Sequence, residues 1–272
     1  MDGELVSLNY GKISSLALDP IEKKPLNRYK PGTMILSGGS FGCNLSCDFC
    51  QNFSIAQGNP QTVEIQPEEF VDRALPLRQY GNIGLAFTYN EPSVWFEYVY
   101  DCAVLAKAKG LDTVLVTNGY INSEPLDELL PFISAMNIDL KGDTRFYREL
   151  CKAAISTGAA AKADAEVSAG AAVGSDASAG ADAVVKATIK KAHRYCHVEI
   201  TTLVVPGWND NIDFIRETAD WIASVSDEIP LHLSRFFPRH RMSDSLPTDI
   251  EFLLRAAEVA SRSLKYVYTG NM

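Results

Sequence analysis

Hydrophobic residues along this chain follow two periods that alternate over most of its length. Short apolar runs typical of buried strands are each followed by a stretch whose apolar positions lie three and four residues apart, as on one face of a helix. The runs predict strands over residues 34–36, 82–88, 112–116, 135–140, 197–205 and 230–236. The other stretches predict helices over residues 67–75, 93–109, 124–133, 185–196, 211–224 and beyond 248.

Glycines and small polar residues mark several of the predicted helix ends. Gly110 follows the helix over 93–109 and closes it. Ser123 is placed to cap the next helix, and Thr248 and Glu251 have the spacing of a capping box for the last one. Residues 266–268 predict a short strand at the end of the chain.

The pattern predicts a single domain over residues 1–272 with two atypical segments. Residues 1–33 contain an alternating stretch over 5–16, which predicts a β-hairpin, and a loop after it. Residues 154–181 consist largely of Ala, Gly, Ser, Val and Asp without a repeating apolar stripe. Such a segment cannot bury enough surface to fold firmly, so we expect a flexible surface insertion that a protease would cut first.

Strands that alternate with helices predict an α/β fold of parallel strands joined by right-handed crossovers. In barrels built this way, the residues that carry chemistry collect at the carboxyl ends of the strands. The residues at such ends here include the cysteines of 43–50, Glu91, Thr117, Asn118, Asp139, Lys141 and Arg235. This coincidence favours an enzyme.

Composition narrows the class of protein. The formal net charge of −9 disfavours a broad surface for binding nucleic acid. No apolar run approaches the ~18–20 residues of a membrane span. The start, Met1-Asp2-Gly3-Glu4, lacks the basic and apolar regions of a signal peptide. We therefore expect a cytoplasmic protein with reduced thiols and no disulfide bonds.

Three of the six cysteines, Cys43, Cys47 and Cys50, lie close together in the spacing C-x3-C-x2-C, after a glycine-rich stretch. Thiolates are soft ligands that suit iron–sulfur clusters, zinc or copper(I). A cubane that serves only as an electron carrier needs four protein ligands. Three local thiolates would therefore leave one iron open for a substrate or cosubstrate.

Two simpler interpretations compete with a cluster. The spacing of the three cysteines also fits one face of a buried helix, but the glycines and the polar residues Asn44, Ser46 and Asp48 favour a loop. A structural zinc site needs a fourth ligand, and neither a second cysteine pair nor a nearby histidine is present. The same periodicity argument predicts that Cys102 and Cys196 belong to the core.

The motifs CNLSCDFCQN, FTYNEP, VTNG, IDLKG, LVVPGWND and SRFFP occur in this order. Their succession resembles the radical S-adenosylmethionine (radical SAM) superfamily, in particular its pyruvate formate-lyase activating enzyme branch and the radical SAM component of the AmmeMemoRadiSam systems. The resemblance covers roughly residues 5–150 and 183–272. It implies a partial (β/α)6 TIM-like barrel, a [4Fe–4S] cluster and S-adenosylmethionine bound to the open iron.

The resemblance also implies roles for individual residues. Cys43, Cys47 and Cys50 would hold the cluster, and Glu91, preceded by Asn90 in FTYNEP, would accept a hydrogen bond from the methionine ammonium. Simpler roles for Glu91 and Lys141 are complementing a helix N-terminus and a solvated surface position. The other implied contacts are Phe49 and Val205 with the adenine, Lys141 with the methionine carboxylate, and Thr117, Asn118 and Asp139 with the ribose or a monovalent cation.

Three departures from the family pattern stand out: an N-terminal cysteine-bearing segment is missing, the segment 154–181 is added, and Phe237 stands where relatives often have histidine. His240 is a candidate substitute for that histidine.

Radical SAM chemistry implies a low-potential electron donor such as flavodoxin or ferredoxin, anaerobic conditions and abstraction of a hydrogen atom. The substrate could be a glycyl-radical enzyme, or another macromolecule or small molecule. A non-catalytic iron–sulfur or metal-binding module is the alternative outside the enzymes.

Overall fold

The computed structural model describes residues 7–154 and 180–272. The predicted insertion over 154–181 therefore falls almost wholly outside the described residues, as do residues 1–6. The strands are β1 (Lys12–Ile13), β2 (Ser15–Pro20), β3 (Met34–Gly39), β4 (Val63–Glu64), β5 (Asn82–Phe87), β6 (Asp112–Thr117), β7 (Ala135–Asp139), β8 (His197–Val204), β9 (Leu231–Arg235) and β10 (Val267–Gly270). The helices are α1 (Phe53–Ala56), α2 (Pro67–Ala74), α3 (Phe96–Ala108), α4 (Ser123–Leu129), α5 (Thr144–Glu149), α6 (Ala181–Ala192), α7 (Ile212–Val225) and α8 (Ile250–Ala260).

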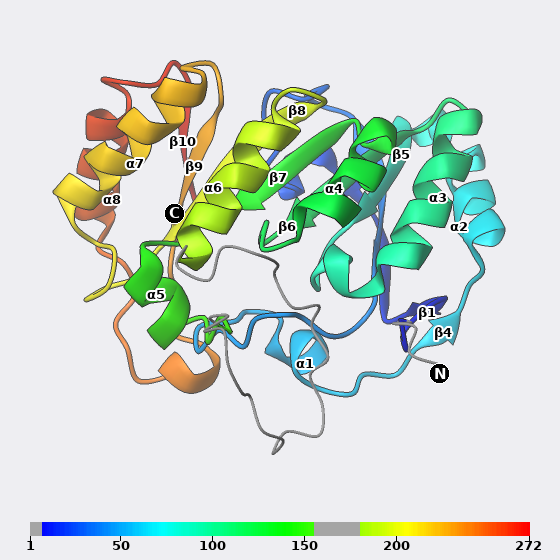
Figure 1. The fold of residues 1–272 in the computed structure, drawn as a ribbon, viewed down its shortest axis with the longest axis horizontal. Coiled ribbons are helices and arrows are strands. Elements are labelled where there is room, and N and C mark those ends of the chain that lie inside the picture. Colours follow the sequence, from blue (N-terminus) through cyan, green and yellow to red (C-terminus); the bar gives the residue numbers. More distant parts are fainter. Residues whose placement is uncertain (1–6, 155–179) are drawn as a thin grey trace.

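Within the described ranges, one sheet of eight strands organises the molecule (Figure 1). Its order is β10-β9-β8-β7-β6-β5-β3-β2, and only the β2–β3 pair is antiparallel. The edge strands β10 and β2 do not pair with each other, so the parallel strands form a partial barrel that is not closed. The α/β class and the partial barrel predicted from the sequence are confirmed.

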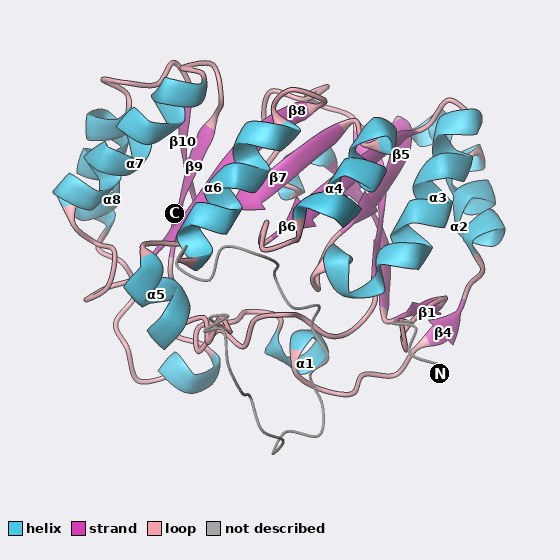
Figure 2. Ribbon diagram, viewed as in Figure 1, coloured by secondary structure: helices cyan, strands magenta, loops and turns pink. Residues whose placement is uncertain are grey.

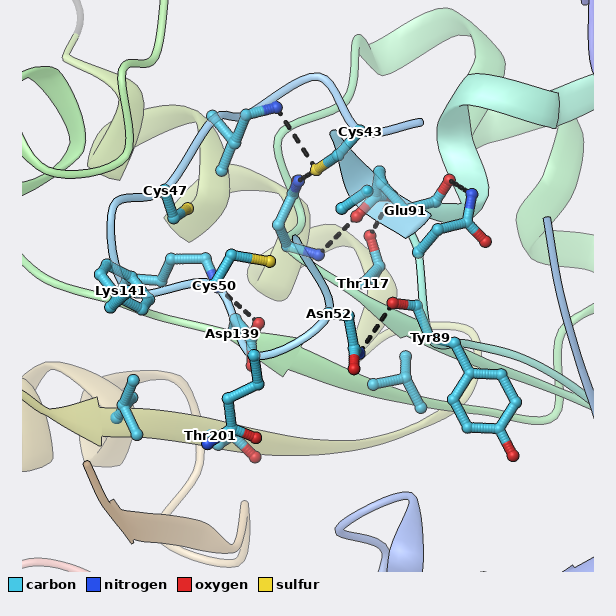
Figure 3. Close-up of a pocket in the computed structure, with 18 of the residues that line it drawn as sticks. Cys43, Cys47, Cys50, Asn52, Tyr89, Glu91, Thr117, Asp139, Lys141 and Thr201 are labelled. Carbon is cyan, nitrogen blue, oxygen red and sulfur yellow. Dashed lines mark hydrogen bonds and ion pairs between the residues drawn. The ribbon is translucent and has the colours of Figure 1, made fainter. Parts of the chain in front are cut away.

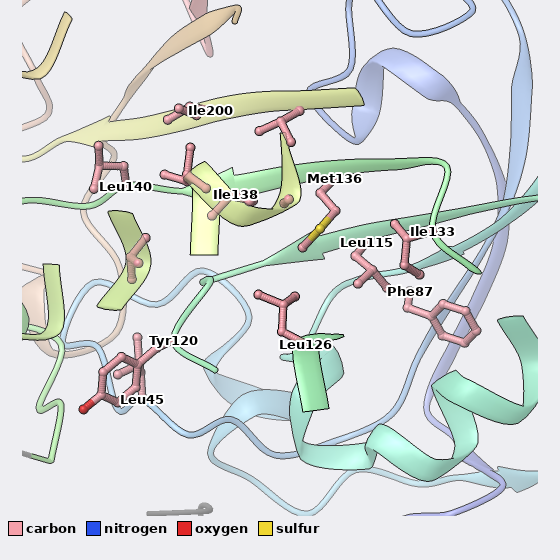
Figure 4. Packing of buried hydrophobic residues seen from close by; sticks show 14 of the residues in the cluster. Leu45, Phe87, Leu115, Tyr120, Leu126, Ile133, Met136, Ile138, Leu140 and Ile200 are labelled. Atoms are coloured by element: carbon pink, nitrogen blue, oxygen red, sulfur yellow. The ribbon is translucent and has the colours of Figure 1, made fainter. Parts of the chain in front are cut away.

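Each face of the curved sheet has its own core. On the outer face, apolar side chains such as Phe87, Leu115, Met136 and Ile200 are buried with residues of the helices (Figure 4). Figure 2 shows these helices lying along the sheet. On the inner face, Ile35, Ala86, Val114 and Ala135 form a smaller core with Ile21 and Leu26 from the loop after β2.

The structure differs from the sequence-based expectations at three places. The predicted cap at Ser123 is wrong, because Asn122 occupies the N-cap position of α4 and Ser123 is the first residue of the helix. The expected hairpin over 5–16 is wrong in its pairing, because β1 pairs with β4 and β2 pairs with β3. The last helix is capped by Asp249, whose side chain accepts a hydrogen bond from the Glu251 N–H. The Thr248 hydroxyl instead donates to the Val204 carbonyl at 2.6 Å, so it ties the loop after β9 to β8.

The closing strand predicted at 266–268 is present as β10 and adds one more parallel strand to the sheet. In the part of the chain that the structure describes, no helix is both long and apolar enough to cross a membrane.

Candidate functional site

The three clustered cysteines lie in the irregular loop that connects β3 to α1, as the sequence predicted. Asn90, just after β5, holds the first half of this loop. Its side-chain amide donates to the carbonyls of Phe41 and Gly42, both at 3.2 Å, and accepts from the Ser40 N–H at 2.8 Å. An amide that uses both its ends in this way fixes the position of backbone that lies outside any helix or strand.

The second half of the loop is held by charge. Asp48 forms ion pairs with Lys152 at 2.9 Å and with Arg241 at 3.2 Å. Lys152 follows α5 and Arg241 belongs to the segment after β9, so elements far apart in the sequence meet at Asp48. Ion pairs at a partly exposed position contribute modestly to stability, and their main effect here is to position the loop.

A cavity of about 270 Å³ opens between the cysteine loop and the carboxyl ends of the strands (Figure 3). Most of the residues predicted to form the site line it: Cys43, Cys47, Phe49, Cys50, Asn90, Glu91, Thr117, Asn118, Asp139 and Lys141. They come from the cysteine loop and from the ends of β5, β6 and β7. The fold thus brings together residues spread over roughly a hundred positions of sequence, as the strand-end argument predicted.

Burial and neighbouring groups raise the pKa of the three thiols. It raises the pKa of Cys43 far above its ordinary value, with the Glu91 carboxylate as the next cause, and it also raises that of Cys50. For Cys47, a hydrogen bond with the Cys151 thiol is the largest cause of a raised pKa, followed by burial. Without a cation the thiols therefore stay protonated, and metal binding would release their protons.

Glu91 is fully enclosed at the end of β5. Its carboxylate accepts hydrogen bonds from the Thr117 hydroxyl at 2.7 Å, the Asn118 N–H at 2.8 Å and the Ser93 N–H at 3.1 Å. Burial nevertheless raises the pKa of this carboxyl, since it outweighs these three bonds. The bond from Ser93 caps the short turn after β5, so the helix-terminal role coexists with a position on the cavity wall.

Asp139 and Lys141 form an ion pair of 2.6 Å at the end of β7. Burial lowers the pKa of Lys141, but the negative charge of the Asp139 carboxylate outweighs it, and the pKa lies well above its ordinary value. Lys141 is thus a firmly charged cation on the wall of the cavity, and its side chain is only 13% exposed, so the alternative of a solvated surface position does not hold. Its ammonium also lies 5.9 Å from the centre of the Phe49 ring.

Several residues considered from the sequence lie elsewhere. Val205 is fully buried and is not part of the cavity lining. Phe237 is exposed and stacks on the Arg235 guanidinium. His240 stacks on Phe53 of α1, with 4.6 Å between ring centres. Neither Phe237 nor His240 faces the cavity in the described structure.

Sequence reasoning missed other residues of the cavity wall: Gln51, Asn52, Thr88, Tyr89, Val116, Thr201, Leu203, Ser234 and Asn271. Thr201 and Leu203 alternate along β8 and face the barrel interior, a period-2 pattern that could have identified them. Asn271 donates to the Ser234 hydroxyl at 2.9 Å. That contact joins the end of β10 to β9, and no local motif indicates it.

The residues present fit a [4Fe–4S] cluster. Three thiols surround one cavity next to a lysine ammonium, which suits an anionic cluster. Among the described residues, no three His, Cys, Asp or Glu side chains gather closely enough to hold one metal ion. A cubane would place each protein ligand on a different iron, so the three thiols need not converge on one point to hold it.

Comparisons with known proteins agree with this geometry. A family model described as "Radical SAM superfamily" matches residues 39–222. A Methanocaldococcus jannaschii protein described as "Uncharacterized protein" is 39% identical over 278 aligned residues, which cover 100% of this chain and 74% of that protein.

Solved structures with low sequence identity share the fold. The crystal structure of a domain of pyruvate-formate lyase-activating enzyme from Bacteroides vulgatus has a TM-score of 0.51 at 17% identity, covering 69% of this chain and 99% of that one. SuiB of Streptococcus suis bound to S-adenosylmethionine has a TM-score of 0.60 at 13% identity, covering 86% of this chain and 49% of that one.

Proposed function

Since the chain belongs to the radical SAM superfamily, whose members use a [4Fe–4S] cluster and S-adenosylmethionine, we propose that Cys43, Cys47 and Cys50 hold this cluster. The protein then cleaves S-adenosylmethionine reductively and abstracts a hydrogen atom from its substrate. The placement of the three thiols, Glu91 and Lys141 around one cavity carries the proposal. The cluster and cosubstrate supply the electron and the 5′-deoxyadenosyl radical, and the protein supplies binding and orientation.

The charged side chains of the wall match the two charged groups of a methionine. Glu91 Oε1 accepts two hydrogen bonds and Oε2 accepts one, so Oε2 keeps a lone pair that can take a hydrogen bond from the ammonium. Lys141 can pair with the carboxylate by turning from Asp139. Because neither group is well solvated, each gains a strong partner when the cosubstrate binds.

The remaining residues predicted from the sequence complete the binding site. Phe49 is buried against Phe146, with 5.6 Å between ring centres, and offers an aromatic surface for the adenine. Thr117, Asn118 and Asp139 bring hydroxyl, amide and carboxylate groups to the ribose or to a monovalent cation. Asn90 acts indirectly, through the loop backbone that it holds.

The proposed reaction also implies an electron donor and a cellular environment. The cluster needs a low-potential donor, which we propose to be a flavodoxin or a ferredoxin in an anaerobic cytoplasm. The exposed segment beside the cysteine loop carries Arg239 and Arg241, whose charge complements the acidic surface of such a donor.

Anaerobic reconstitution with iron and sulfide, followed by dithionite and S-adenosylmethionine, tests the proposal. The wild-type protein should release 5′-deoxyadenosine, and Cys47→Ala should release none and bind less iron. Cys196→Ala, which removes a partly buried cysteine outside the cavity, is the control and should behave as the wild type. A wild type that holds a cluster but releases no 5′-deoxyadenosine would be a non-catalytic module.

Within this reaction class we propose glycyl-radical activation of a partner protein as the specific function, as in pyruvate formate-lyase activating enzymes. The support is the motif succession from the cysteine loop to Arg235. A peptide that contains dideuterated glycine serves as the probe, and deuterium should appear in the 5′-deoxyadenosine. Turnover without deuterium transfer would instead favour modification of another macromolecule or of a small molecule.

A further inference from the structure

Two N–H groups reach the sulfur of Cys43, the first of the three clustered cysteines (Figure 3). The Leu45 backbone N–H donates to this sulfur at 3.4 Å, and the side-chain amide of Asn118 donates to it at 3.7 Å. Sulfur accepts over longer distances than oxygen because it is the larger atom. Leu45 belongs to the cysteine loop itself, whereas Asn118 follows β6 directly. The Asn118 amide therefore reaches the sulfur from a separate element of the fold.

The Asn118 amide is oriented so that its nitrogen, and not its oxygen, faces Cys43. The Asn118 oxygen accepts a hydrogen bond from the Tyr120 backbone N–H at 2.8 Å, and the Asn118 nitrogen donates to the Asn44 side-chain oxygen at 2.7 Å. The Asn44 nitrogen in turn donates to the Tyr120 carbonyl at 2.7 Å. Reversing either amide would bring two donors or two acceptors together. The backbone of Tyr120 thus sets the orientation of both amides.

Asn118 is fixed through its backbone as well as through its side chain. It is buried, and its backbone N–H donates to the Glu91 carboxylate at 2.8 Å. No rearrangement is therefore needed to place the amide at the sulfur. An amide nitrogen has no acceptor function and no protonation equilibrium in water, so the direction of this bond is the same at every pH. A cysteine that binds iron is a thiolate, which can only accept a hydrogen bond.

Resting on the cluster site proposed above, we propose that Asn118 is a positioning residue that donates an N–H hydrogen bond to the cluster ligand Cys43 and raises the reduction potential of the cluster. Hydrogen bonds to cluster sulfurs are one of the means by which a protein sets this potential. Reduction adds one negative charge, so an N–H donor stabilises the reduced state more than the oxidised one. The amide also borders the cavity, so this role adds to the contact with the cosubstrate proposed above.

Two substitutions of Asn118 test the proposal in the full chain after anaerobic reconstitution with iron and sulfide. Asn118→Asp keeps the size of the side chain and an oxygen that can accept from Tyr120, but it has no N–H for the sulfur. Asn118→Ala removes both groups. Asn82→Ala is the matched control, because Asn82 is also buried and its amide joins the Ala74 carbonyl to the Leu36 N–H, but it does not line the cavity. The measurements are iron and sulfide per chain and the midpoint potential from a redox titration followed by electron paramagnetic resonance.

We expect both Asn118 variants to bind as much iron and sulfide per folded chain as the wild type and to have a more negative midpoint potential. Asn82→Ala should match the wild type in both measurements. A potential that is unchanged or more positive in the Asn118 variants overturns the inference. So does an equal shift in Asn82→Ala, which would attribute the change to lost packing. A loss of iron in both Asn118 variants also overturns it, because Asn118 would then serve cluster assembly. If the wild type takes up no cluster at all, the proposed function fails and this inference fails with it.

Discussion

Glu199 on β8 places a carboxylate inside the barrel, away from the cavity. It accepts hydrogen bonds from His232 at 2.6 Å and His197 at 3.0 Å, and from the backbone N–H groups of Asn27 and Arg28 at 3.1 and 2.7 Å. Burial raises the pKa of Glu199, but these bonds outweigh it and hold the pKa at about 2. One side chain thus links β8, β9 and the loop after β2.

Replacing this carboxylate should lower stability in a pH-dependent way. Because the pKa falls from 4.5 to about 2 on folding, its stabilisation is complete above pH 4.5 and is lost as the pH falls through about 2. We expect Glu199→Gln to lose about 1–3 kcal/mol of unfolding free energy at pH 7. The difference from the wild type should shrink in the acid range. Urea unfolding over a pH series measures it, with the exposed Glu217→Gln as control. A difference that persists at pH 2 would contradict the assignment.

Among individual residues, the sequence identified those with polar or metal-binding side chains directly after an apolar strand. The cysteines, Glu91 and Lys141 follow apolar strands directly, and strand ends of a parallel sheet converge, so their meeting could be predicted. The support of the cysteine loop by Leu150 and Cys151 could not be found in this way, because their carbonyls accept hydrogen bonds from the Asp48 and Ser46 N–H groups only through the fold of the segment after α5. The sequence also could not show that Asp249 caps the last helix in place of Thr248, because the Thr248 hydroxyl donates instead to a carbonyl of β8.

Among the elements, β3 has the most exacting role, because it delivers the chain into the cysteine loop. It lies between β2 and β5, and its last residue is Gly39, beside the turn after β5. A Cβ atom on Gly39 would lie 2.6 Å from the Thr88 carbonyl oxygen and 3.0 Å from the Tyr89 side chain. Tyr89 itself has a φ of 73° and donates its hydroxyl to Asp19 at 2.6 Å, so it has little room to move.

Gly39→Ala should therefore displace the start of the cysteine loop. We expect a loss of about 1–3 kcal/mol in unfolding free energy from overpacking, together with less iron bound per folded chain after reconstitution. Gly270→Ala is the control at the end of another strand, where the added Cβ would lie 3.7 Å from the Ser234 hydroxyl oxygen, an ordinary contact. Equal iron content in the two variants would show that the loop does not depend on this close approach.

Across the whole molecule, the inner face of the sheet has two parts with different roles. Near the carboxyl ends it forms the cavity, and farther down it is filled by Ile21 and Leu26 around Ile35, Val114 and Ala135. The loop that supplies Ile21 and Leu26 was expected from the sequence only as a connection after a hairpin. Its role depends on contacts with strands distant in sequence, which periodicity cannot reveal.

Because these two parts of the inner face are separate, we predict that a substitution in the core around Leu26 lowers the unfolding free energy without altering the cavity. Leu26 is fully buried, so Leu26→Ala should cost roughly 2–5 kcal/mol of unfolding free energy, measured by urea unfolding. Leu8→Ala, at a side chain that is 82% exposed, should cost little. Under conditions where both variants stay folded, both should bind as much iron per chain as the wild type, because Leu26 belongs to the smaller inner core and does not itself line the cavity. A selective loss of iron in Leu26→Ala would mean that the smaller inner core around Leu26 positions the cavity, so that the core and the cavity depend on each other.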